Sequence, residues 1–133
     1  MPVDPLFLSL AEVLEIHKDQ ITRYGGAVGI RDIGLLKSAI AMPQATFGGA
    51  YLHTDLAEMA AAYLYHLVRN HAFIDGNKRV GAVASLVFLL MNGVEFRATN
   101  TQLYRMVIGV ADGTIEKSDV TTFIREHSVH PKE

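Results

Sequence analysis

The stretch HAFIDGNKRVG, residues 71–81, places a histidine, a carboxylate, a glycine, an amide and two cations in front of a long apolar run. The apolar run, residues 80–91, is too short to span a bilayer, which needs about 20 residues, so we expect a buried helix there. The polar residues then occupy the preceding loop and the first turn of this helix. A first turn leaves backbone N–H groups unpaired and carries the positive end of the helix dipole, so it can bind an anion.

The second half of this stretch has the residue types of a phosphate site. Gly76, Asn77 and Lys78 can present several backbone amides to one anion, and Gly76 also allows a phosphate to approach closely. The side chains of Lys78 and Arg79 add positive charge. Each residue alone also fits ordinary helix-start chemistry, in which Gly-Asn forms a turn and Lys-Arg a solvated face.

Two further residues add chemistry to the anion site. Asp75 is poorly placed beside a bare anion, but it suits a Mg²⁺ ion that bridges its carboxylate and phosphate oxygens. His71 can take a proton from an attacking hydroxyl, because a histidine with a typical pKa of about 6.5 is largely neutral at the pH of the cell. A base, a metal carboxylate and a phosphate cradle together indicate phosphotransfer. The alternatives are a capping histidine and a carboxylate that only favours the helix dipole.

Helices should account for nearly all the elements that position this loop. The first begins at the cap Ser9 and ends at Gly25-Gly26, the second is RDIGLLKSAI (31–40), and the third runs from the cap Thr54 to residues 69–70. A fourth covers 77–91, and two more cover 100–111 and 118–127. Between the second and third, PQATFGGAYLH (43–53) has hairpin character. We therefore predict an all-α bundle of about six helices with a short hairpin.

Composition limits the classes of function. The 133 residues, half of them hydrophobic, suffice for one domain spanning residues 1–133 with its own core. The net charge of −2 argues against nonspecific binding to nucleic acid or to an anionic membrane. The chain has no cysteine, which excludes disulfides and thiolate metal sites. The opening MPVDPLFLSL lacks the features of a secretion signal, so we expect a cytoplasmic protein.

The loop also resembles the signature of the Fic/Doc family, H-x-F-x-[D/E]-G-N-x-R, at six positions: His71, Phe73, Asp75, Gly76, Asn77 and Arg79. The resemblance extends over roughly residues 8–97 and is greatest to the death-on-curing (Doc) branch. It implies an all-α fold and an enzyme that transfers part of ATP to a protein hydroxyl. By position it implies His71 as the general base, Asp75 as the Mg²⁺ ligand, and Gly76, Asn77 and Arg79 as phosphate binders.

Two departures from the nucleotidyl-transferring members bear on the reaction. Lys78 replaces the second glycine of G-N-G-R, and Ala82 stands where those enzymes place a second arginine. A long cationic side chain would fill the subsite of a further phosphate group. The Doc branch has the same lysine and is associated with a reversed nucleotide, so that the γ-phosphate faces the hydroxyl. Arg69, just before the loop, resembles an arginine of that branch and is a candidate phosphate contact, although a helix-end arginine also suits the dipole.

Recognition and regulation are likewise implied by the resemblance. The family uses a hairpin as a flap that pairs with the backbone of the target, and residues 43–53 are the candidate here. No inhibitory [S/T]-x-x-x-E-[G/N] sequence is present, because the nearest match, Thr122 to Glu126, is followed by His127. Inhibition would then come from an antitoxin in trans.

The sequence therefore predicts a Doc-type protein Ser/Thr kinase that uses ATP and Mg²⁺, with His71, Asp75, Lys78 and Arg79 as catalytic residues. The implied role is a growth-arresting toxin, with elongation factor Tu as the implied target. The alternatives are an AMP transferase and a helical interaction domain without catalysis.

Overall fold

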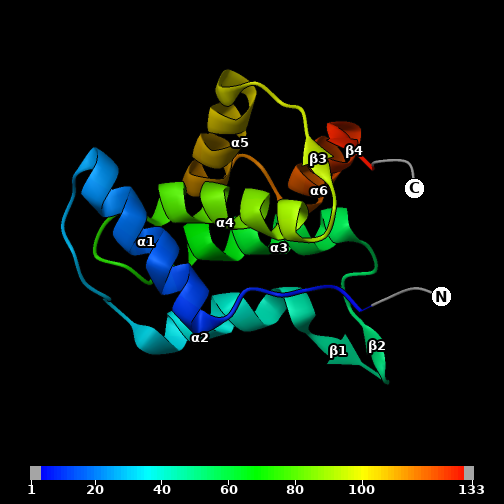
Figure 1. The fold of residues 1–133 in the computed structure, drawn as a ribbon, viewed down its shortest axis with the longest axis horizontal. Coiled ribbons are helices and arrows are strands. Elements are labelled where there is room, and N and C mark those ends of the chain that lie inside the picture. Colours follow the sequence, from blue (N-terminus) through cyan, green and yellow to red (C-terminus); the bar gives the residue numbers. More distant parts are fainter. Residues whose placement is uncertain (1–3, 131–133) are drawn as a thin grey trace.

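The computed structural model describes residues 4–130, which form six α-helices connected by short loops (Figure 1). The helices are α1 (Leu10–Tyr24), α2 (Ile33–Ala41), α3 (Leu56–Arg69), α4 (Asn77–Met91), α5 (Asn100–Asp112) and α6 (Lys117–Glu126), with a single 3₁₀ turn at Met42–Gln44. The predicted all-α architecture is confirmed, helix by helix.

The core is built around α3, which packs against α2, α4, α5 and α6. Its run Ala60, Ala61 and Ala62 is fully buried, and these small side chains let the neighbouring helices approach closely. The tightest approach is to α4 at Gly81, where a Cβ atom would lie 2.6 Å from Cγ2 of Val68. This pair of helices forms a rigid frame for the loop that connects them.

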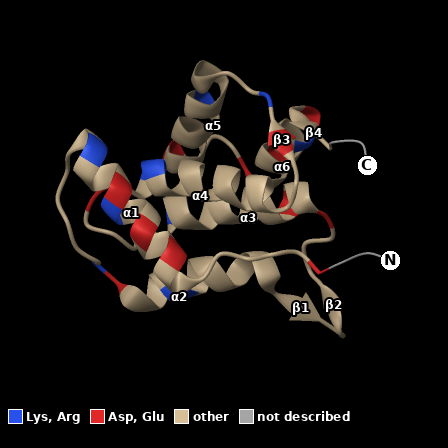
Figure 2. Ribbon diagram, in the orientation of Figure 1, with Lys and Arg blue, Asp and Glu red and all other residues tan. Residues whose placement is uncertain are grey.

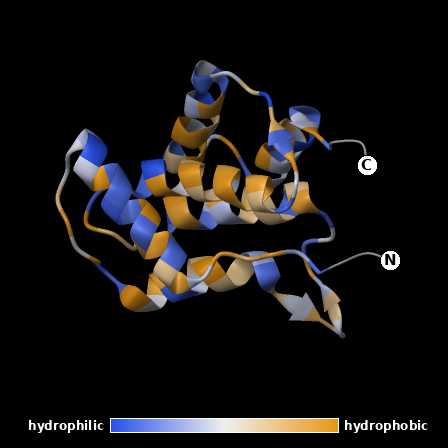
Figure 3. Ribbon diagram, viewed as in Figure 1, coloured by the Kyte–Doolittle hydropathy of each residue, from blue (hydrophilic) through white to orange (hydrophobic). Residues whose placement is uncertain are grey.

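The apolar run at residues 80–91 forms most of α4, which is orange over most of its length in Figure 3. Val80, Ala84 and Phe88 are completely buried, but Leu90 is 74% exposed and several other residues of the run are only partly buried. The expectation of a helix buried on all sides is therefore wrong, because the bundle covers α4 along one side only. Within residues 4–130, none of the helices has the length and hydropathy needed to cross a membrane.

The predicted hairpin is present as β1 (Thr46–Phe47) and β2 (Ala50–Tyr51), which pair antiparallel. Gly48 and Gly49 form its turn with φ values of 60° and 83°, as a tight two-residue hairpin requires. A second two-stranded ribbon joins β3 (Glu95–Phe96) to β4 (Ser128–Val129) and was not predicted.

The helix caps agree with the sequence patterns except at α3. Ser9 and Glu12 form the predicted capping box of α1. At α3 the predicted cap Thr54 is wrong by one residue, because the side chain of Asp55 accepts the Glu58 N–H. Thr54 instead donates its N–H and its hydroxyl to the Glu58 carboxylate.

Candidate active site

The loop that carries residues 71–76 connects the end of α3 to the start of α4 and lies beside α1 (Figure 1). An extended segment, residues 25–32, runs antiparallel along it. The N–H groups of Arg31 and Asp32 both donate to the Ala72 carbonyl, and Ile74 N–H donates to the Gly29 carbonyl at 3.1 Å. The path of the loop is thus held by backbone hydrogen bonds, which leave its side chains available.

The guanidinium of Arg31 is a second anchor at the entrance of the loop. Its Nε donates to the carbonyl of His71 at 2.7 Å, and its Nη2 donates to the carbonyl of Asn70 at 3.3 Å. Both carbonyls follow the last turn of α3, where the helix leaves acceptors without intrahelical partners. The cation therefore stabilises the sharp exit from α3 and fixes the backbone of His71.

His17 of α1 contacts the middle of the loop through its ring. Its ring stacks on Phe73 with a centroid separation of 3.9 Å and an interplanar angle of 5°. Its Nε2 donates to the Asp75 carbonyl oxygen at 2.9 Å. Both rings are buried, so an aromatic pair lies directly beneath the two exposed residues Ile74 and Asp75.

The side chain of Asn77 makes its hydrogen bonds within the loop. Its Oδ1 accepts the Phe73 N–H and its Nδ2 donates to the Phe73 carbonyl, each at 3.0 Å. The amide side chain therefore closes the loop onto itself and is not free for a phosphate. Its backbone N–H, at the first position of α4, is the group that remains for an anion.

His71 is exposed and has a φ of 50°, a left-handed conformation that is uncommon outside glycine. The Arg31 hydrogen bond to its carbonyl holds this backbone geometry. Strained residues of this kind cluster at functional sites, where the surrounding structure pays for the strain. The imidazole is presented to solvent at the rim of the site, where a hydroxyl can reach it.

The Asp75 carboxylate is exposed and held by two backbone groups. Its Oδ2 accepts the Ala27 N–H at 3.2 Å, and its Oδ1 accepts the Gly76 N–H at 2.8 Å. These bonds lower the pKa of Asp75, and the positive charges of Arg79 and Lys78 lower it further. The carboxylate is therefore ionised at neutral pH and oriented before any ligand binds.

The start of α4 combines open amides with two cations. Gly76 caps the helix with a φ of 84° and, having no side chain, supplies no capping bond to the first turn. Arg79 is anchored by a bond from Nη1 to the Gln20 carbonyl at 3.2 Å, whereas Lys78 is exposed. The charged residues that surround this helix start are coloured in Figure 2. An anion placed here would meet fixed positive charge.

Gly26 makes room for this arrangement. A Cβ atom at its position would lie 2.7 Å from Oδ2 of Asp75 and 3.1 Å from Nη2 of Arg79, and its φ of 125° is one that other residues rarely adopt. The carboxylate and the guanidinium thus each lie close to the bare backbone of Gly26, where a side chain would displace them.

The guanidinium of Arg69 contacts the end of α5 (Asn100–Asp112). Its Nη1 donates to the carbonyl of Val110 at 3.3 Å and lies 3.4 Å from the Cβ position of Gly113, which caps α5. This is the helix-end interaction that the sequence left open, made with the C-terminus of α5. In this conformation the guanidinium is hydrogen-bonded to the last turn of α5.

The carboxylate of Asp75 fits the Mg²⁺ ion expected at the site, because it is ionised, exposed and oriented. Within residues 4–130, no three acidic, histidine or cysteine side chains are grouped to hold a metal. A Mg²⁺ ion commonly binds through one or two carboxylates and takes its other ligands from phosphates and water. Asp75 alone can therefore supply the protein ligand.

Sequence reasoning did not identify Arg31, His17 or Gly26 as parts of this site. His17 lies on the inward stripe of α1, and a buried imidazole needs a hydrogen-bond partner, so its burial was a usable signal. Arg31 and Gly26 lie about 40 residues before the loop, and only the fold brings them to it.

The hairpin β1–β2 lies far from His71. It precedes α3, whereas the loop follows α3, a helix of 14 residues and about 21 Å, and Figure 1 shows them on opposite sides of the molecule. The segment that does pair with the loop is 25–32, through the bridge between Ile30 and Phe73. The target-pairing role predicted for residues 43–53 stays a prediction, and this position does not favour it.

Comparison with known proteins agrees with this arrangement. The sequence profile of the Fic/DOC family matches residues 7–89. A protein named Protein kinase doc, from Escherichia phage P1, is 36% identical over 118 residues, which cover 89% of this chain and 92% of that relative. A protein named Toxin Doc, from Mycolicibacterium smegmatis, is 48% identical over 75 residues, which cover 56% of this chain and 58% of that relative. The second match therefore spans little more than half the length of the mycobacterial protein.

Proposed function

The chain belongs to the Fic/DOC family, and on that premise we propose that it is a Doc-type protein kinase. It transfers the γ-phosphate of ATP to a Ser or Thr hydroxyl of another protein. The observation that carries the proposal is the start of α4, where Lys78 stands in the place of the family's second glycine and is exposed, as are His71 and Asp75 of the preceding loop. The name of the phage P1 relative, Protein kinase doc, supports the same reaction.

In the proposed reaction the imidazole of His71 takes the proton of the acceptor hydroxyl. The hydroxyl oxygen forms a bond to the γ-phosphorus, the bond from that phosphorus to the β,γ-bridging oxygen breaks, and ADP leaves. The backbone N–H groups of Asn77 and Lys78 and the guanidinium of Arg79 hold the phosphate charge through the transfer, beside Gly76, whose own N–H is donated to Asp75. Asp75 would hold a Mg²⁺ ion, which would supply further positive charge to offset that of the phosphates.

The acceptor protein would approach along the segment 25–32. This segment is exposed, is already extended, and carries Val28 and Ile30 next to Ile74 of the loop, with exposed fractions of 75%, 40% and 57%. Apolar side chains around an extended backbone suit an acceptor peptide in strand conformation. Elongation factor Tu, the style of target associated with the Doc branch, is the first acceptor to test.

The biological role that we propose is a growth-arresting toxin controlled by an antitoxin. Both named relatives are Doc proteins, and one is called a toxin. Thr122 and Glu126, the nearest match to an inhibitory sequence, lie in α6, which packs against α3. Control by a second protein in trans is consistent with both observations, and the site of action would be the cytoplasm.

The decisive experiment incubates the purified chain with elongation factor Tu and ATP labelled at either the α- or the γ-phosphate, followed by intact-mass measurement of the acceptor. Label from the γ-position and the mass of one phosphate group are expected. Label from the α-position and the mass of AMP would instead establish an AMP transferase. If Mg-ATP neither labels a protein from a cell extract nor raises the melting temperature of the chain, the helical domain is not an enzyme of this class.

A further inference from the structure

The backbone of His71 adopts a conformation that glycine normally supplies. Helix α3 ends at its C-cap Asn70, which is right-handed with a φ of −75°, and His71 follows with a φ of 50°. Helices commonly end with a left-handed residue at this position, and it is usually glycine, because a Cβ atom makes the conformation unfavourable. Every other residue with a positive φ among residues 4–130 is a glycine. Within this range His71 is therefore the exception, and an interaction has to hold it there.

Arg31 supplies that interaction through three consecutive peptide groups. Its backbone N–H donates to the carbonyl of Ala72 at 2.7 Å, its Nε donates to the carbonyl of His71 at 2.7 Å, and its Nη2 donates to the carbonyl of Asn70 at 3.3 Å. The two side-chain bonds are charge-assisted, and the planar guanidinium can reach both carbonyls at once. Arg31 therefore restrains the peptide groups on both sides of the His71 Cα atom.

Neither side chain has another partner in the part of the chain that the structure describes. The Arg31 guanidinium is exposed and belongs to none of the three ion pairs among residues 4–130. The His71 imidazole is also exposed and takes part in no hydrogen bond within these residues. A catalytic base is commonly oriented by a third group that bonds to its side chain. Without such a group, the direction of the ring depends on the peptide groups that Arg31 restrains.

We propose that Arg31 is a positioning residue for His71. The inference rests on the proposed kinase function and deepens it, because it names a residue that the transfer step needs although it acts only through the base. A base must lie about 2.6–3.2 Å from the hydroxyl oxygen whose proton it takes. The left-handed backbone directs the Cα–Cβ bond of His71 and hence the imidazole. Loss of Arg31 lets the residue relax toward a right-handed or extended conformation, which turns the ring away from that position.

The first test separates kcat from KM in Arg31→Ala. This variant keeps the backbone bond to Ala72, so segment 25–32 should remain in place. The kcat of transfer should fall by about tenfold, a part of the roughly hundredfold loss that a misplacement of 1 Å can cause. The KM values for ATP and for the acceptor should be unchanged. Arg31→Lys should lose nearly as much, because an ammonium keeps the charge but lacks the planar fork. Arg97→Ala removes an arginine whose side chain is 61% exposed, and this control should transfer at the normal rate.

The second test removes the base itself. In His71→Ala, the further change Arg31→Ala should not slow the remaining transfer, because Arg31 acts through the imidazole. Equal losses with and without the imidazole would overturn the proposal, since Arg31 would then serve ATP or the acceptor directly. An unchanged kcat in Arg31→Ala, full activity in Arg31→Lys, or a raised KM with an unchanged kcat would also overturn it. Each of these results leaves the kinase proposal intact.

An NMR measurement tests the inference without any activity. The scalar coupling between the N–H and the Hα of His71 depends on φ, so it should change in Arg31→Ala and stay the same in Arg97→Ala. If the unmutated chain transfers no phosphate, the kinase proposal fails, while this coupling still decides whether Arg31 holds the backbone of His71. The melting temperature checks that each variant folds, and Arg31→Lys carries the test if Arg31→Ala is unstable. The same coupling in every variant would overturn the inference.

Discussion

The starts of α3 and α4 show how the same structural element serves two opposite purposes. At α3, the carboxylate of Asp55 caps the first turn and accepts the Glu58 N–H at 2.8 Å, and Glu58 adds a second negative charge. At α4, Gly76 supplies no side-chain cap, and the first turn carries two cations and no acid. At the start of α3 the N–H groups and charges are bonded to other groups of the protein. At the start of α4 the backbone N–H groups and the two cations remain available for a ligand.

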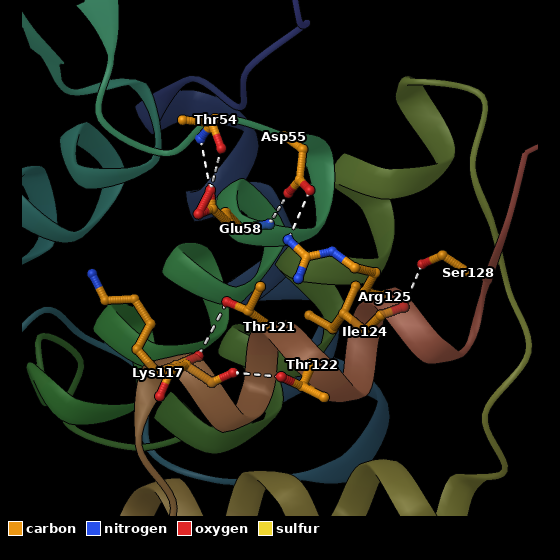
Figure 4. A network of polar contacts seen from close by, with 10 residues as sticks. Thr54, Asp55, Glu58, Lys117, Thr121, Thr122, Ile124, Arg125 and Ser128 are labelled. Carbon is orange, nitrogen blue, oxygen red and sulfur yellow. Dashed lines mark hydrogen bonds and ion pairs between the residues drawn. The ribbon is translucent and has the colours of Figure 1, made fainter.

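The surroundings of α3 extend this contrast (Figure 4). Arg125 of α6 donates to Asp55 at 2.7 Å, while Thr54 bonds to Glu58, so the charged groups pair with one another. A hollow of about 920 Å³ lies beside this network, nearly four times the volume of a second hollow, of about 250 Å³, beside Lys78. The charged groups at this helix start are therefore paired with one another, although a large hollow lies beside them.

Among substitutions near the start of α4, the largest loss of phosphate transfer should come from replacing the general base, His71. His71→Ala should lower the rate of phosphate transfer by about two to four orders of magnitude, the usual contribution of a general base. ATP binding and the melting temperature should be retained, because the imidazole is exposed. His130→Ala, an exposed histidine that lines the larger hollow, is the control and should leave the rate unchanged. A normal rate in His71→Ala would remove the base from the mechanism.

Replacing Lys78, the cation that follows the cap Gly76 of α4, should cause the second largest loss of phosphate transfer. Lys78→Gly removes one charge-assisted phosphate contact, worth about 1.5 to 3 kcal/mol. Transfer should therefore fall by about one to two orders of magnitude, at roughly tenfold per 1.36 kcal/mol. The change also reopens the subsite of a further phosphate, so weak label from α-³²P-ATP should appear on the acceptor. Undiminished transfer would show that Lys78 is only a solvated residue.

The two helix starts also show which features of the fold and of the site can be predicted from the sequence. The six helices, the hairpin and the loop at 71–76 follow from local periodicity, caps and glycines, and all are present. The sequence predicts Thr54 as the cap of α3 instead of Asp55, because both residue types cap helices. What separates them in the structure is the local bond from Thr54 to Glu58 and the tertiary pairing of Asp55 with Arg125. Arg31 was missed for a related reason, since its partners lie 39 and 40 residues away in the sequence.

The carboxylate at the open helix start gives a third prediction. Asp75→Asn removes a negative charge but keeps an oxygen that can accept the Ala27 N–H, so the fold should survive. The Mg²⁺ concentration needed for half-maximal transfer should rise by about tenfold or more, since even residues that only support a metal ligand affect metal affinity by about 10–100-fold. A magnesium titration of the transfer rate measures this shift. An unchanged magnesium requirement would mean that the carboxylate only organises the loop.

A polar cluster between α3 and α6 should affect stability and not activity. Lys117 Nζ donates to Nε2 of His66 at 2.9 Å and lies 3.3 Å from Nε2 of His53. Burial, followed by the charge of Lys117 and the nearby His53, lowers the pKa of His66 to about 4. The pKa of His53 is also lowered, first by burial and then by Lys117, while Glu58 opposes the shift.

Because the folded-state pKa of His66 lies below the unfolded value of about 6.5, protonation favours unfolding. The stabilisation is complete above pH 6.5 and should decline as the pH falls toward 4. His66→Gln keeps an acceptor for Lys117 but does not titrate. Urea unfolding at pH 7 and pH 4.5 should show a loss smaller by about 1 to 3 kcal/mol in this variant than in the unmutated chain. Equal losses in the two proteins would exclude His66 as the titrating group.

The smallest effect should come from the ion pair at the closed helix start. Both side chains of the Asp55–Arg125 pair are about half exposed, and exposed pairs of this kind contribute less than about 1 kcal/mol. Asp55→Asn keeps a residue that caps helices well and removes only the pair, whereas Asp55→Ala also removes the cap and should cost about 1 kcal/mol more.

Combining Asp55→Asn with Arg125→Gln isolates the coupling between the two side chains, and added salt should reduce it. Burial alone would raise the pKa of Asp55, but the Glu58 N–H and Arg125 lower it overall, so the contribution of the pair should disappear as the pH falls through that lowered pKa. Transfer of phosphate should be unaffected in all three variants, because this network satisfies its own charges at the opposite end of α3 from His71. A loss of transfer in Asp55→Asn without a loss of stability would break the contrast and place a second functional site beside the larger hollow.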